Sequence, residues 1–307
     1  MSNKKIILVT GANGQLGSEM QMLSGSYPEY EFLFVTRSEL PIDDEKAVEN
    51  FFSTHPINYC VNCAAYTAVD KAETDSENAF IINGSAVGIL AKYCKLQGAT
   101  FIHISTDYVF DGTATSPYKE EDIVNPVNLY GASKLKGEQL AIFNNPDSII
   151  IRTSWVYSFS GNNFVKTMLR LMKERESIQV VSDQLGSPTY AADLAAAIMQ
   201  IINQLKQSPF LLNEVREIGQ IFNYSNQGVI NWYQFALAIK EFSGTGCVVN
   251  PILSSHYPTP AKRPNYSVMD TSKIERTFHL VIPNWKDSLQ KCVKLLLGQK
   301  NSKFSLG

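Results

Sequence analysis

The sequence lacks the charge pattern of a protein that binds nucleic acid or a membrane surface. Its 307 residues hold 27 Lys and Arg against 29 Asp and Glu, a formal net charge of -2, with no basic tail and no long run of one sign. Proteins without a basic patch have little non-specific attraction for phosphate backbones or anionic lipids. We therefore expect neither nucleic acid nor a membrane as a partner, whereas a few local Arg or Lys residues suffice to bind a small anionic substrate.

Long apolar runs are also missing. No segment approaches the roughly 18 apolar residues of a membrane-spanning helix. The start, Met-Ser-Asn-Lys-Lys, leads straight into a short strand without the apolar core of a signal peptide. We therefore expect a cytoplasmic protein.

Cysteine is scarce, with five residues in the chain. Cys60 and Cys63 form a C-x-x-C pattern, but they lie in the apolar run 59–65, which is typical of a buried strand. Positions three apart on a strand point to opposite faces, and no second pair completes a zinc site. We therefore expect structural thiols in a reducing compartment.

What the chain does have is a regular alternation of apolar runs and helical spacing. The apolar runs predict strands at residues 6–10, 31–35, 59–62, 99–105 and 148–151. The spacing of apolar residues predicts helices at residues 16–23, 48–52, 75–95 and 130–143, with Asp43 and Asp44 as candidate caps of the second. Strands that are apolar throughout are typical of a parallel sheet covered by helices on both faces. The predicted fold is therefore α/β, with a Rossmann-type doubly wound parallel sheet.

The alternation loosens after Arg152. Helical spacing and one apolar run predict helices at 163–175, 191–204, 232–242 and 285–297, a strand at 178–181 and a Pro-rich loop at 257–264. We expect residues 1–155 to form an NAD(P)-binding domain to which later segments, about 178–230, return. Residues 156–307 are expected to form mainly a smaller C-terminal substrate-binding lobe.

A glycine loop follows the first predicted strand and opens the first predicted helix. It reads Gly-Ala-Asn-Gly-Gln-Leu-Gly at residues 11–17. In this context the first glycine permits a tight turn, the second lets backbone N–H groups approach a pyrophosphate, and the third lets the helix pack on the strand. The loop predicts a dinucleotide site with contacts from Gly11, Asn13, Gly14, Gln15 and Leu16.

The end of the second predicted strand indicates which dinucleotide is bound. An NAD site usually has an acidic residue about 20 residues after the glycine loop, for the ribose 2′-hydroxyl. Here the strand ends Val-Thr-Arg-Ser at residues 35–38, without an acid at its tip. The guanidinium of Arg37 is suited to a 2′-phosphate. This favours NADPH, with NADH as the alternative, although a solvated surface arginine would give the same pattern.

A candidate catalytic set lies at the end of the fourth predicted strand and on the helix that follows. Thr106 ends the strand, and Tyr130 and Lys134 share one helix face because they are four residues apart. A phenol with an ordinary pKa near ~10 is a poor acid at neutral pH, and we expect the ammonium of Lys134 to lower that pKa. In this interpretation Tyr130 transfers a proton, Lys134 also holds the nicotinamide ribose, and Thr106 orients the substrate oxygen.

Together these residues resemble the extended short-chain dehydrogenase family of nucleotide-sugar enzymes, over nearly the whole chain. The resemblance rests on the motifs Gly-Ala-Asn-Gly-Gln-Leu-Gly at 11–17, Asn-Cys-Ala-Ala-Tyr-Thr-Ala-Val-Asp-Lys-Ala-Glu at 62–73, Ser-Thr-Asp-Tyr-Val-Phe-Asp-Gly at 105–112, Tyr-Gly-Ala-Ser-Lys at 130–134, Arg-Thr-Ser-Trp-Val-Tyr at 152–157, Gly-Asn-Asn-Phe at 161–164, Asp-Gln-Leu-Gly-Ser-Pro-Thr at 183–189 and Tyr-Pro-Thr-Pro-Ala-Lys-Arg-Pro at 257–264. So many motifs in one order are far more specific than a glycine loop alone.

The resemblance implies roles for further residues. It places Ala64, Ala65 and Tyr66 along the cofactor, and Asp43 or Asp44 near the adenine. It implies substrate contacts from Val69, Thr106, Asp107, Trp155, Asn163 and Arg263, with Trp155 as an aromatic wall and Arg263 as a cation for the diphosphate. The substrate that it implies is a dTDP-linked sugar.

The resemblance leaves a metal ion open. Some relatives are homodimers with magnesium bound by glutamates at the interface, and a homodimer is expected here too. Glu19 matches one such ligand, but Ala192 stands where a second glutamate would be expected. We therefore predict no metal site, and a ketone reduction in which a tyrosine supplies the proton needs none.

The reaction that the resemblance implies is NADPH-dependent reduction of the C4 ketone of a dTDP-linked 4-keto-6-deoxy sugar. One alternative is another nucleotide-sugar 4-ketoreductase or epimerase on the same scaffold; an epimerase would retain NAD, and Arg37 argues against it. A second alternative is a non-catalytic regulatory subunit, as some relatives are for methionine adenosyltransferase. The presence of Thr106, Tyr130 and Lys134 together argues against that alternative.

Overall fold

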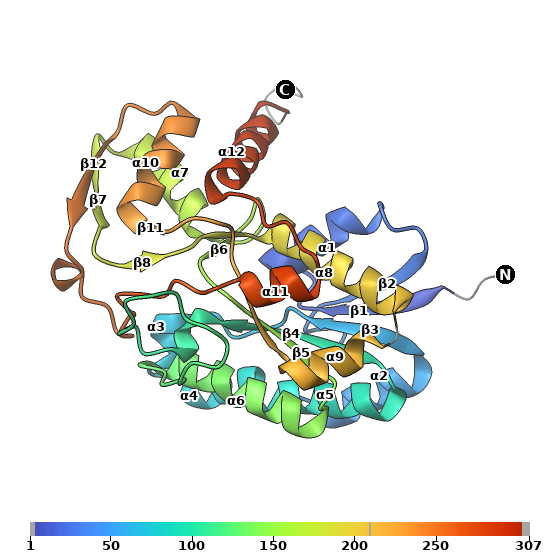
Figure 1. Ribbon diagram of the computed structural model, residues 1–307. Helices are drawn as coiled ribbons and strands as arrows, with labels where there is room; N and C mark the ends of the chain where they lie inside the picture. The colour runs from blue at the N-terminus through green and yellow to red at the C-terminus, as the bar shows by residue number, and fades with distance from the viewer. Residues whose placement is uncertain (1–3, 209, 303–307) are drawn as a thin grey trace.

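A parallel sheet of six strands runs through the larger part of the protein (Figure 1), in a computed structural model that describes residues 4–208 and 210–302. The strand order is β10-β5-β4-β3-β1-β2, and every neighbouring pair is parallel. The strands are β1 (Lys5–Thr10), β2 (Tyr30–Val35), β3 (Ile57–Asn62), β4 (Thr100–Thr106), β5 (Ile149–Thr153) and β10 (Ile221–Tyr224). The predicted Rossmann-type sheet is confirmed.

Helices cover both faces of this sheet. On one face Ile7 and Val9 of β1 pack in a cluster with residues of α1 (Gln15–Ser24) and α8 (Ala191–Gln207). On the other face Leu8 packs with residues of α2 (Glu45–Thr54), α5 (Ala86–Gln97) and α6 (Leu129–Asn144). This double cover explains why the strands are apolar throughout.

The two cysteines of the C-x-x-C pattern face opposite sides of the sheet, as expected, although β3 ends at Asn62, one residue before Cys63. Cys60 belongs to the cluster on the α5 face, whereas Cys63 packs against the cluster on the α1 face. Both are free thiols. The pattern is therefore a consequence of an apolar strand and not a redox pair.

The helix predicted over residues 75–95 differs from the expectation in its middle. It consists of α4 (Ser76–Phe80), a π-helical turn (Ile81–Ser85) and α5. A π turn inserts an extra residue into the helical register, which apolar spacing alone does not reveal. Of the two candidate caps, Asp44 caps α2, because its carboxylate accepts from the N–H groups of Lys46 at 3.0 Å and Ala47 at 3.1 Å.

The same helical stretch corrects the expectation that no segment has the length of a membrane span. Ser76–Gln97 is a 22-residue helix with a mean hydropathy of 1.2 in its most apolar window. Val87, Leu90 and Ala91 are nevertheless fully buried in the cluster between α5 and the sheet. The apolar character of this helix is explained by its packing in the core.

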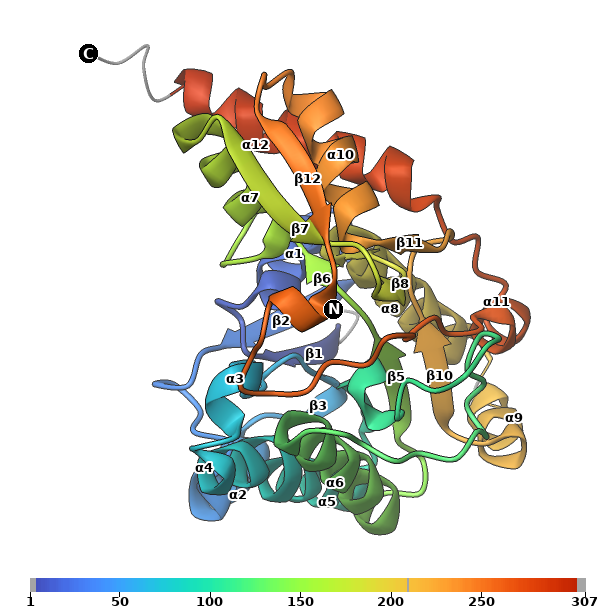
Figure 2. The same ribbon diagram turned by 90° about the vertical axis from the view of Figure 1, so that its left-hand side faces the viewer.

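A second group of elements lies beyond the carboxyl ends of the strands (Figure 2). Helices α7 (Phe164–Glu174), α10 (Trp232–Ser243) and α12 (Trp285–Ser302) surround a separate hydrophobic cluster, beside the parallel strands β7 (Ser177–Val181) and β12 (Val248–Ile252). Short strands connect this region to the sheet, namely β6 (Val156–Tyr157), β8 (Leu185–Gly186), β9 (Thr189–Tyr190) and β11 (Ile230–Asn231). The chain crosses between the two regions more than once, because α8 and β10 return to the sheet.

Several short elements were not predicted. They are α3 (Val69–Ala72), α9 (Leu211–Ile218), α11 (Ser272–Thr277), β10, β12 and single 3-10 turns at Asp107–Val109 and Ser254–His256. Strands β10 and β12 have four and five residues, too few for a periodicity to stand out. Their place is decided by pairing with β5 and β7.

Candidate active site

A cavity of about 720 Å³ opens at the carboxyl edge of the sheet, where β1 and β3 lie side by side and their chains leave in opposite directions. Such a switch point is where ligands bind in open α/β sheets. The predicted residues that line the cavity are Gly11, Asn13, Gly14, Gln15, Leu16, Arg37, Asp43, Ala64, Ala65, Tyr66, Val69, Thr106, Asp107, Tyr130, Lys134 and Trp155. The fold therefore brings residues from most of the predicted motifs to one place.

The glycine loop forms one wall of the cavity. Gly11 has a φ of +65°, and a Cβ there would lie 2.7 Å from the amide nitrogen of Ala64, so only glycine lets the loops after β1 and β3 touch. A Cβ at Gly17 would lie 2.7 Å from the Cα of Ala12, so glycine also permits α1 to approach the strand. Gly14 precedes α1, whose first turn has neither a side-chain cap nor an acidic residue. Its N–H groups are therefore suited to the phosphates of a dinucleotide.

The end of β2 forms the far part of the cavity. Arg37 is 77% exposed, and its Nη2 lies 3.4 Å from Oδ2 of Asp43. The second oxygen of Asp43, Oδ1, is buried and has no hydrogen-bond partner among the described residues. An unpaired buried acceptor is costly unless a ligand supplies a donor, so Asp43 is suited to the exocyclic amine of an adenine. Asp44 caps α2 and does not line the cavity.

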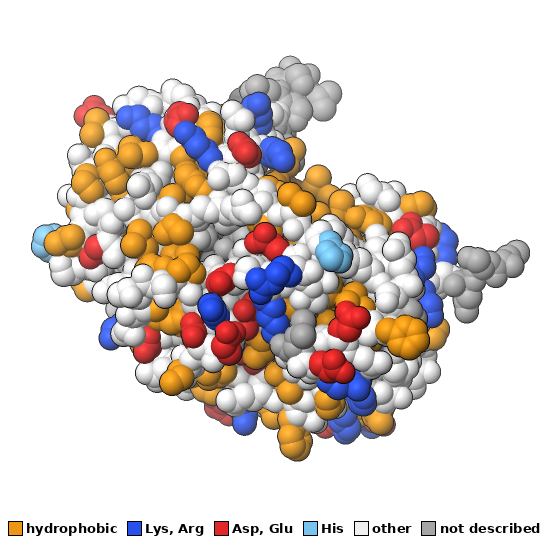
Figure 3. All heavy atoms as spheres, in the orientation of Figure 1, with side chains coloured by type: hydrophobic (Ala, Val, Ile, Leu, Met, Phe, Trp, Pro, Cys, Tyr) orange, Lys and Arg blue, Asp and Glu red, His pale blue; other side chains and the backbone are white. Residues whose placement is uncertain are grey.

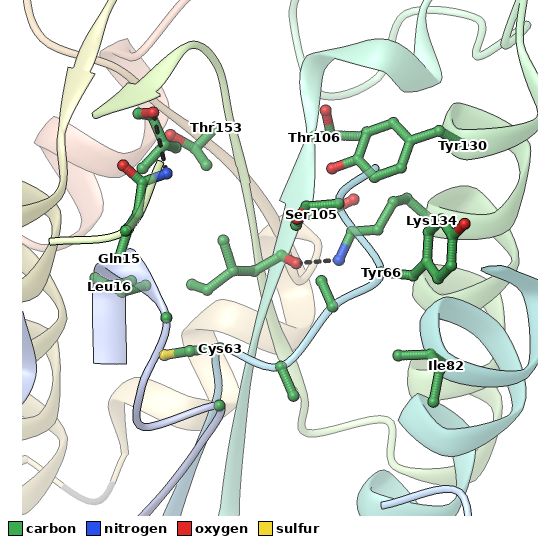
Figure 4. Close-up of a pocket in the computed structure, with 18 of the residues that line it drawn as sticks. Gln15, Leu16, Cys63, Tyr66, Ile82, Ser105, Thr106, Tyr130, Lys134 and Thr153 are labelled. Atoms are coloured by element: carbon green, nitrogen blue, oxygen red, sulfur yellow. Dashed lines mark hydrogen bonds between the residues drawn. The ribbon is translucent and has the colours of Figure 1, made fainter. Parts of the chain in front are cut away.

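The candidate catalytic set lies opposite the glycine loop (Figure 4). Tyr130 and Lys134 extend from α6, and Thr106 from the end of β4. The buried Nζ of Lys134 donates to the carbonyl oxygen of Ile104 at 2.5 Å. Burial lowers the pKa of Lys134 to about 8, against the opposing effect of Glu138. The hydroxyl of Thr106 donates to Oδ1 of Asp107 at 3.0 Å.

The expectation that Lys134 lowers the pKa of Tyr130 is wrong in this structure. Burial and the neighbouring Asp107 carboxylate raise the pKa of Tyr130 to about 12, against a lowering effect of Thr106. Burial also raises the pKa of Asp107 to about 7, and its Oδ2 has no hydrogen-bond partner among the described residues. At neutral pH Tyr130 therefore retains its proton, as a proton donor must.

Two tryptophans form an aromatic wall. Trp155 stacks on Trp232 of α10 with ring centroids 3.6 Å apart, and both side chains line the cavity. Trp155 has a φ of +48°, which is unusual for a residue other than glycine. A Cβ at Gly186 would lie 2.6 Å from the Trp155 ring, so this glycine leaves room for the stack. The unusual backbone turns the indole toward the cavity at a site where strain often accompanies function.

Three other predicted residues do not line the cavity. The amide of Asn163 caps α7 and donates to Gln15 Oε1 at 2.9 Å. Arg263 forms a bidentate ion pair with Asp70, at 3.0 and 2.8 Å, and thereby joins the Pro-rich loop to α3. The carboxylate of Glu19 is buried and accepts from the Ser158 hydroxyl at 2.7 Å. Over the described ranges there is no group of three His, Cys, Asp or Glu that could hold a metal.

Sequence reasoning missed residues that build the site from distant segments. Trp232 had no local signal beyond an amphipathic helix. Asn83, in the π turn, holds the backbone of Tyr66 through both its N–H and its carbonyl and donates to the Ser133 hydroxyl of α6 at 3.0 Å. Asp70 follows Val69 in the motif at residues 62–73, but only the fold shows its pairing with Arg263.

Comparisons with known proteins agree with this geometry. Residues 4–297 match the family described as RmlD substrate binding domain. A dTDP-4-dehydrorhamnose reductase of Aggregatibacter actinomycetemcomitans is 39% identical over 92% of this chain and 97% of its own. A dTDP-4-dehydrorhamnose reductase structure from Clostridium acetobutylicum has a TM-score of 0.87 at 40% identity, covering 95% of this chain and 99% of its own. One from Bacillus anthracis, in complex with NADP, has a TM-score of 0.86 at 36% identity, covering 94% and 99%.

Proposed function

The chain belongs to the RmlD substrate binding domain family, and on that premise we propose that it is an NADPH-dependent dTDP-4-dehydrorhamnose reductase. The reaction is reduction of the C4 ketone of dTDP-4-dehydro-L-rhamnose to dTDP-L-rhamnose, a step of rhamnose biosynthesis. The observation that carries the proposal is the placement of Thr106, Tyr130 and Lys134 in one cavity with an uncapped helix N-terminus behind a glycine loop.

The cofactor, when bound, supplies the hydride. Gly11, Gly14 and the first turn of α1 would hold its phosphates, Asp43 would accept from its adenine, and Arg37 would pair with its 2′-phosphate. This assignment fits the structure because neither Gly11 nor Gly14 carries a Cβ and Asp43 Oδ1 lacks a partner among the described residues.

The chain's own residues manage the proton. Tyr130 gives its phenolic proton to the oxygen at C4 as negative charge develops there. In the structure the Nζ of Lys134 contacts the Ile104 carbonyl and His103 and does not lower the pKa of Tyr130, so its ammonium must turn toward Tyr130 to stabilise the phenolate that remains. The Thr106 hydroxyl, which donates to Asp107 in the structure, turns to the ketone oxygen and orients it.

The substrate is proposed to lie between the catalytic set and the tryptophan wall. Trp155 and Trp232 offer a flat apolar surface, and Val69 and Asp107 line the same cavity. Asn163 and Arg263 lie outside the cavity lining and remain proposed substrate contacts, and Arg263 would exchange Asp70 for a diphosphate oxygen. We propose in addition that residues 156–307 act mainly as the substrate lobe and that the protein is a homodimer.

The test of this function is an assay of NADPH absorbance with dTDP-4-dehydro-L-rhamnose. Stoichiometric loss of NADPH with formation of dTDP-L-rhamnose is expected. Interconversion of C4 isomers without net use of NADPH would favour an epimerase. Tight cofactor binding without any turnover would favour a regulatory subunit.

The mixed distribution of acidic and basic side chains on the face in Figure 3 is in keeping with a small-molecule enzyme.

Cofactor preference gives a separate prediction for Arg37. A charge-assisted hydrogen bond contributes about 1.5–3 kcal/mol, and an exposed site lies at the low end because solvent screens it. Arg37→Ala is therefore expected to raise KM for NADPH about 10-fold and to leave KM for NADH nearly unchanged. Lys46→Ala removes an exposed cation that does not line the cavity and serves as the matched control. Equal losses with both cofactors would contradict recognition of a 2′-phosphate by Arg37.

A further inference from the structure

The surroundings of Lys134 include a histidine that the proposed mechanism does not use. Lys134 is 2% exposed, and its Nζ has two polar neighbours in the described part of the chain, the carbonyl of Ile104 at 2.5 Å and Nε2 of His103 at 3.4 Å. His103 lies in the middle of β4 and is fully buried. A buried imidazole must satisfy both of its nitrogens, so its other contact matters.

The other nitrogen of His103 belongs to a hydrogen-bond network of side chains that crosses three strands. Nδ1 of His103 lies 3.0 Å from the amide nitrogen of Asn62, and Asn62 Oδ1 lies 2.6 Å from the Thr10 hydroxyl. These residues are direct register partners, Thr10 with Asn62 between β1 and β3, and Asn62 with His103 between β3 and β4. None is more than 1% exposed. This hydrogen-bond network therefore crosses the sheet where β1 and β3 lie side by side, and it links the strand before the glycine loop to Lys134.

Which atoms donate and which accept in this hydrogen-bond network depends on the charge of Lys134. As the structure has it, Asn62 donates to Nδ1, so a neutral His103 carries its hydrogen on Nε2 and presents it to Lys134. Only an uncharged amine can accept that hydrogen, because an ammonium has no lone pair. When the Asn62 amide is turned over, its oxygen accepts from Nδ1–H and Nε2 accepts from the Lys134 ammonium. The Thr10 hydroxyl suits both directions because it can donate or accept.

We propose that His103 is a positioning residue for Lys134. When Lys134 gains or loses its proton, the ring hydrogen of His103 moves to the other nitrogen and the Asn62 amide turns over. The proposal rests on the role of Lys134 in the proposed function. His103 keeps one proton in both states and exchanges it between its two nitrogens. Lys134 is the group whose charge changes, and its proton is exchanged with Tyr130 or solvent.

The charged groups around His103 support this assignment. Burial and the Lys134 charge hold the pKa of His103 well below its usual value, so the imidazole stays neutral. Glu138 of α6 is paired with Arg152 of β5, and burial raises the pKa of the Cys63 thiol after β3. Phe101, which stacks on His103, carries no charge. Burial raises the pKa of Asp107 to about 7, but its carboxylate lies farther along the cavity, where it accepts from Thr106 and raises the pKa of Tyr130. Lys134, whose pKa lies at about 8, is the titrating group in contact with the His103 ring.

Nitrogen NMR of the histidine rings tests the proposal without an activity assay. The chain has four histidines, so a ¹⁵N-histidine-labelled full-length sample gives few ring signals, and loss of one set in His103→Gln assigns His103. Between about pH 6 and pH 10, His103 is expected to stay neutral and to move its hydrogen from Nδ1 to Nε2, with a midpoint near the pKa of Lys134, about 8. The same move of the hydrogen from Nδ1 to Nε2 with rising pH is expected with NADP⁺ bound. Protonation of His103 to an imidazolium at its ordinary pKa, or one tautomer throughout, would overturn the proposal.

Kinetics of matched variants give a second test. His103→Phe keeps an aromatic ring beside Phe101 and removes both nitrogens, so we expect kcat to fall about 10- to 100-fold as Lys134 loses its support. His103→Gln restores a polar group and should recover part of kcat, while the affinity for NADPH changes little. His256→Phe, at an exposed histidine, is the control and should match wild type. Wild-type kcat and an unchanged alkaline pH limb in a folded His103→Phe protein would overturn the positioning role. The NMR result stands even where the protein fails to reduce the proposed sugar.

Discussion

Replacing Tyr130 with Phe is expected to lower kcat for ketone reduction by about 100- to 10,000-fold, the range that a positioned general acid contributes. The ring still packs in the cavity, so the affinity for NADPH should change little. Because burial and Asp107 raise the pKa of Tyr130 to about 12, wild-type Tyr130 remains a proton donor across the neutral range. Steady-state rates with NADPH and the dTDP sugar, together with fluorescence titration of the cofactor, measure both effects.

Tyr108 provides the comparison for this variant. Its ring meets that of Tyr130 edge-on, with centroids 5.8 Å apart, and it lines the same cavity. Tyr108→Phe removes a phenol hydroxyl next to that of Tyr130. Unlike Tyr130, Tyr108 has no lysine on its own element, the turn Asp107–Val109. Its effect on kcat should be far smaller than that of Tyr130→Phe. Undiminished turnover in Tyr130→Phe, or an equal loss in Tyr108→Phe, would contradict the assignment of the proton donor.

Replacing Arg152 with Met is expected to destabilise the protein by about 3–5 kcal/mol, the usual cost of leaving one partner of a buried ion pair without the other. Arg152 and Glu138 are each 2% exposed and are joined by two hydrogen bonds, at 2.9 and 2.7 Å. Glu138 also accepts from the Ser105 hydroxyl at 2.5 Å, so it ties α6 to β4 and β5 beneath the candidate catalytic residues. Urea unfolding followed by circular dichroism measures the loss.

Two further variants separate the buried charge from the volume of the side chain. Adding Glu138→Gln to Arg152→Met removes the unpaired carboxylate and should recover much of the lost stability. Arg170→Met breaks the exposed pair with Glu174 and should cost less than about 1 kcal/mol. A loss from Arg152→Met as small as that from Arg170→Met would show that the buried pair contributes little to folding.

Much of the site could be predicted because its signals are local. The glycine loop, the strand end at Thr106 and the pair Tyr130 and Lys134 each depend on residues within one turn or one strand end. Parallel strands then bring their carboxyl ends to one edge, so separate local signals converge in space. The electrostatics could not be predicted in the same way. The sign of the pKa change at Tyr130 depends on how deeply the phenol is buried and on Asp107, which folding brings beside it.

The sequence by itself determined the class of sheet and the family resemblance, and it pointed to the candidate dinucleotide loop and catalytic set, because apolar periodicity and short motifs reflect backbone geometry over a few residues. The tertiary structure alone decided which distant side chains meet. It placed Trp232 against Trp155, Asn83 against Tyr66, Asp70 against Arg263, and aligned Thr10, Asn62 and His103 beneath Lys134. Such contacts depend on strand register and helix packing between segments far apart in the chain, and no local pattern encodes them.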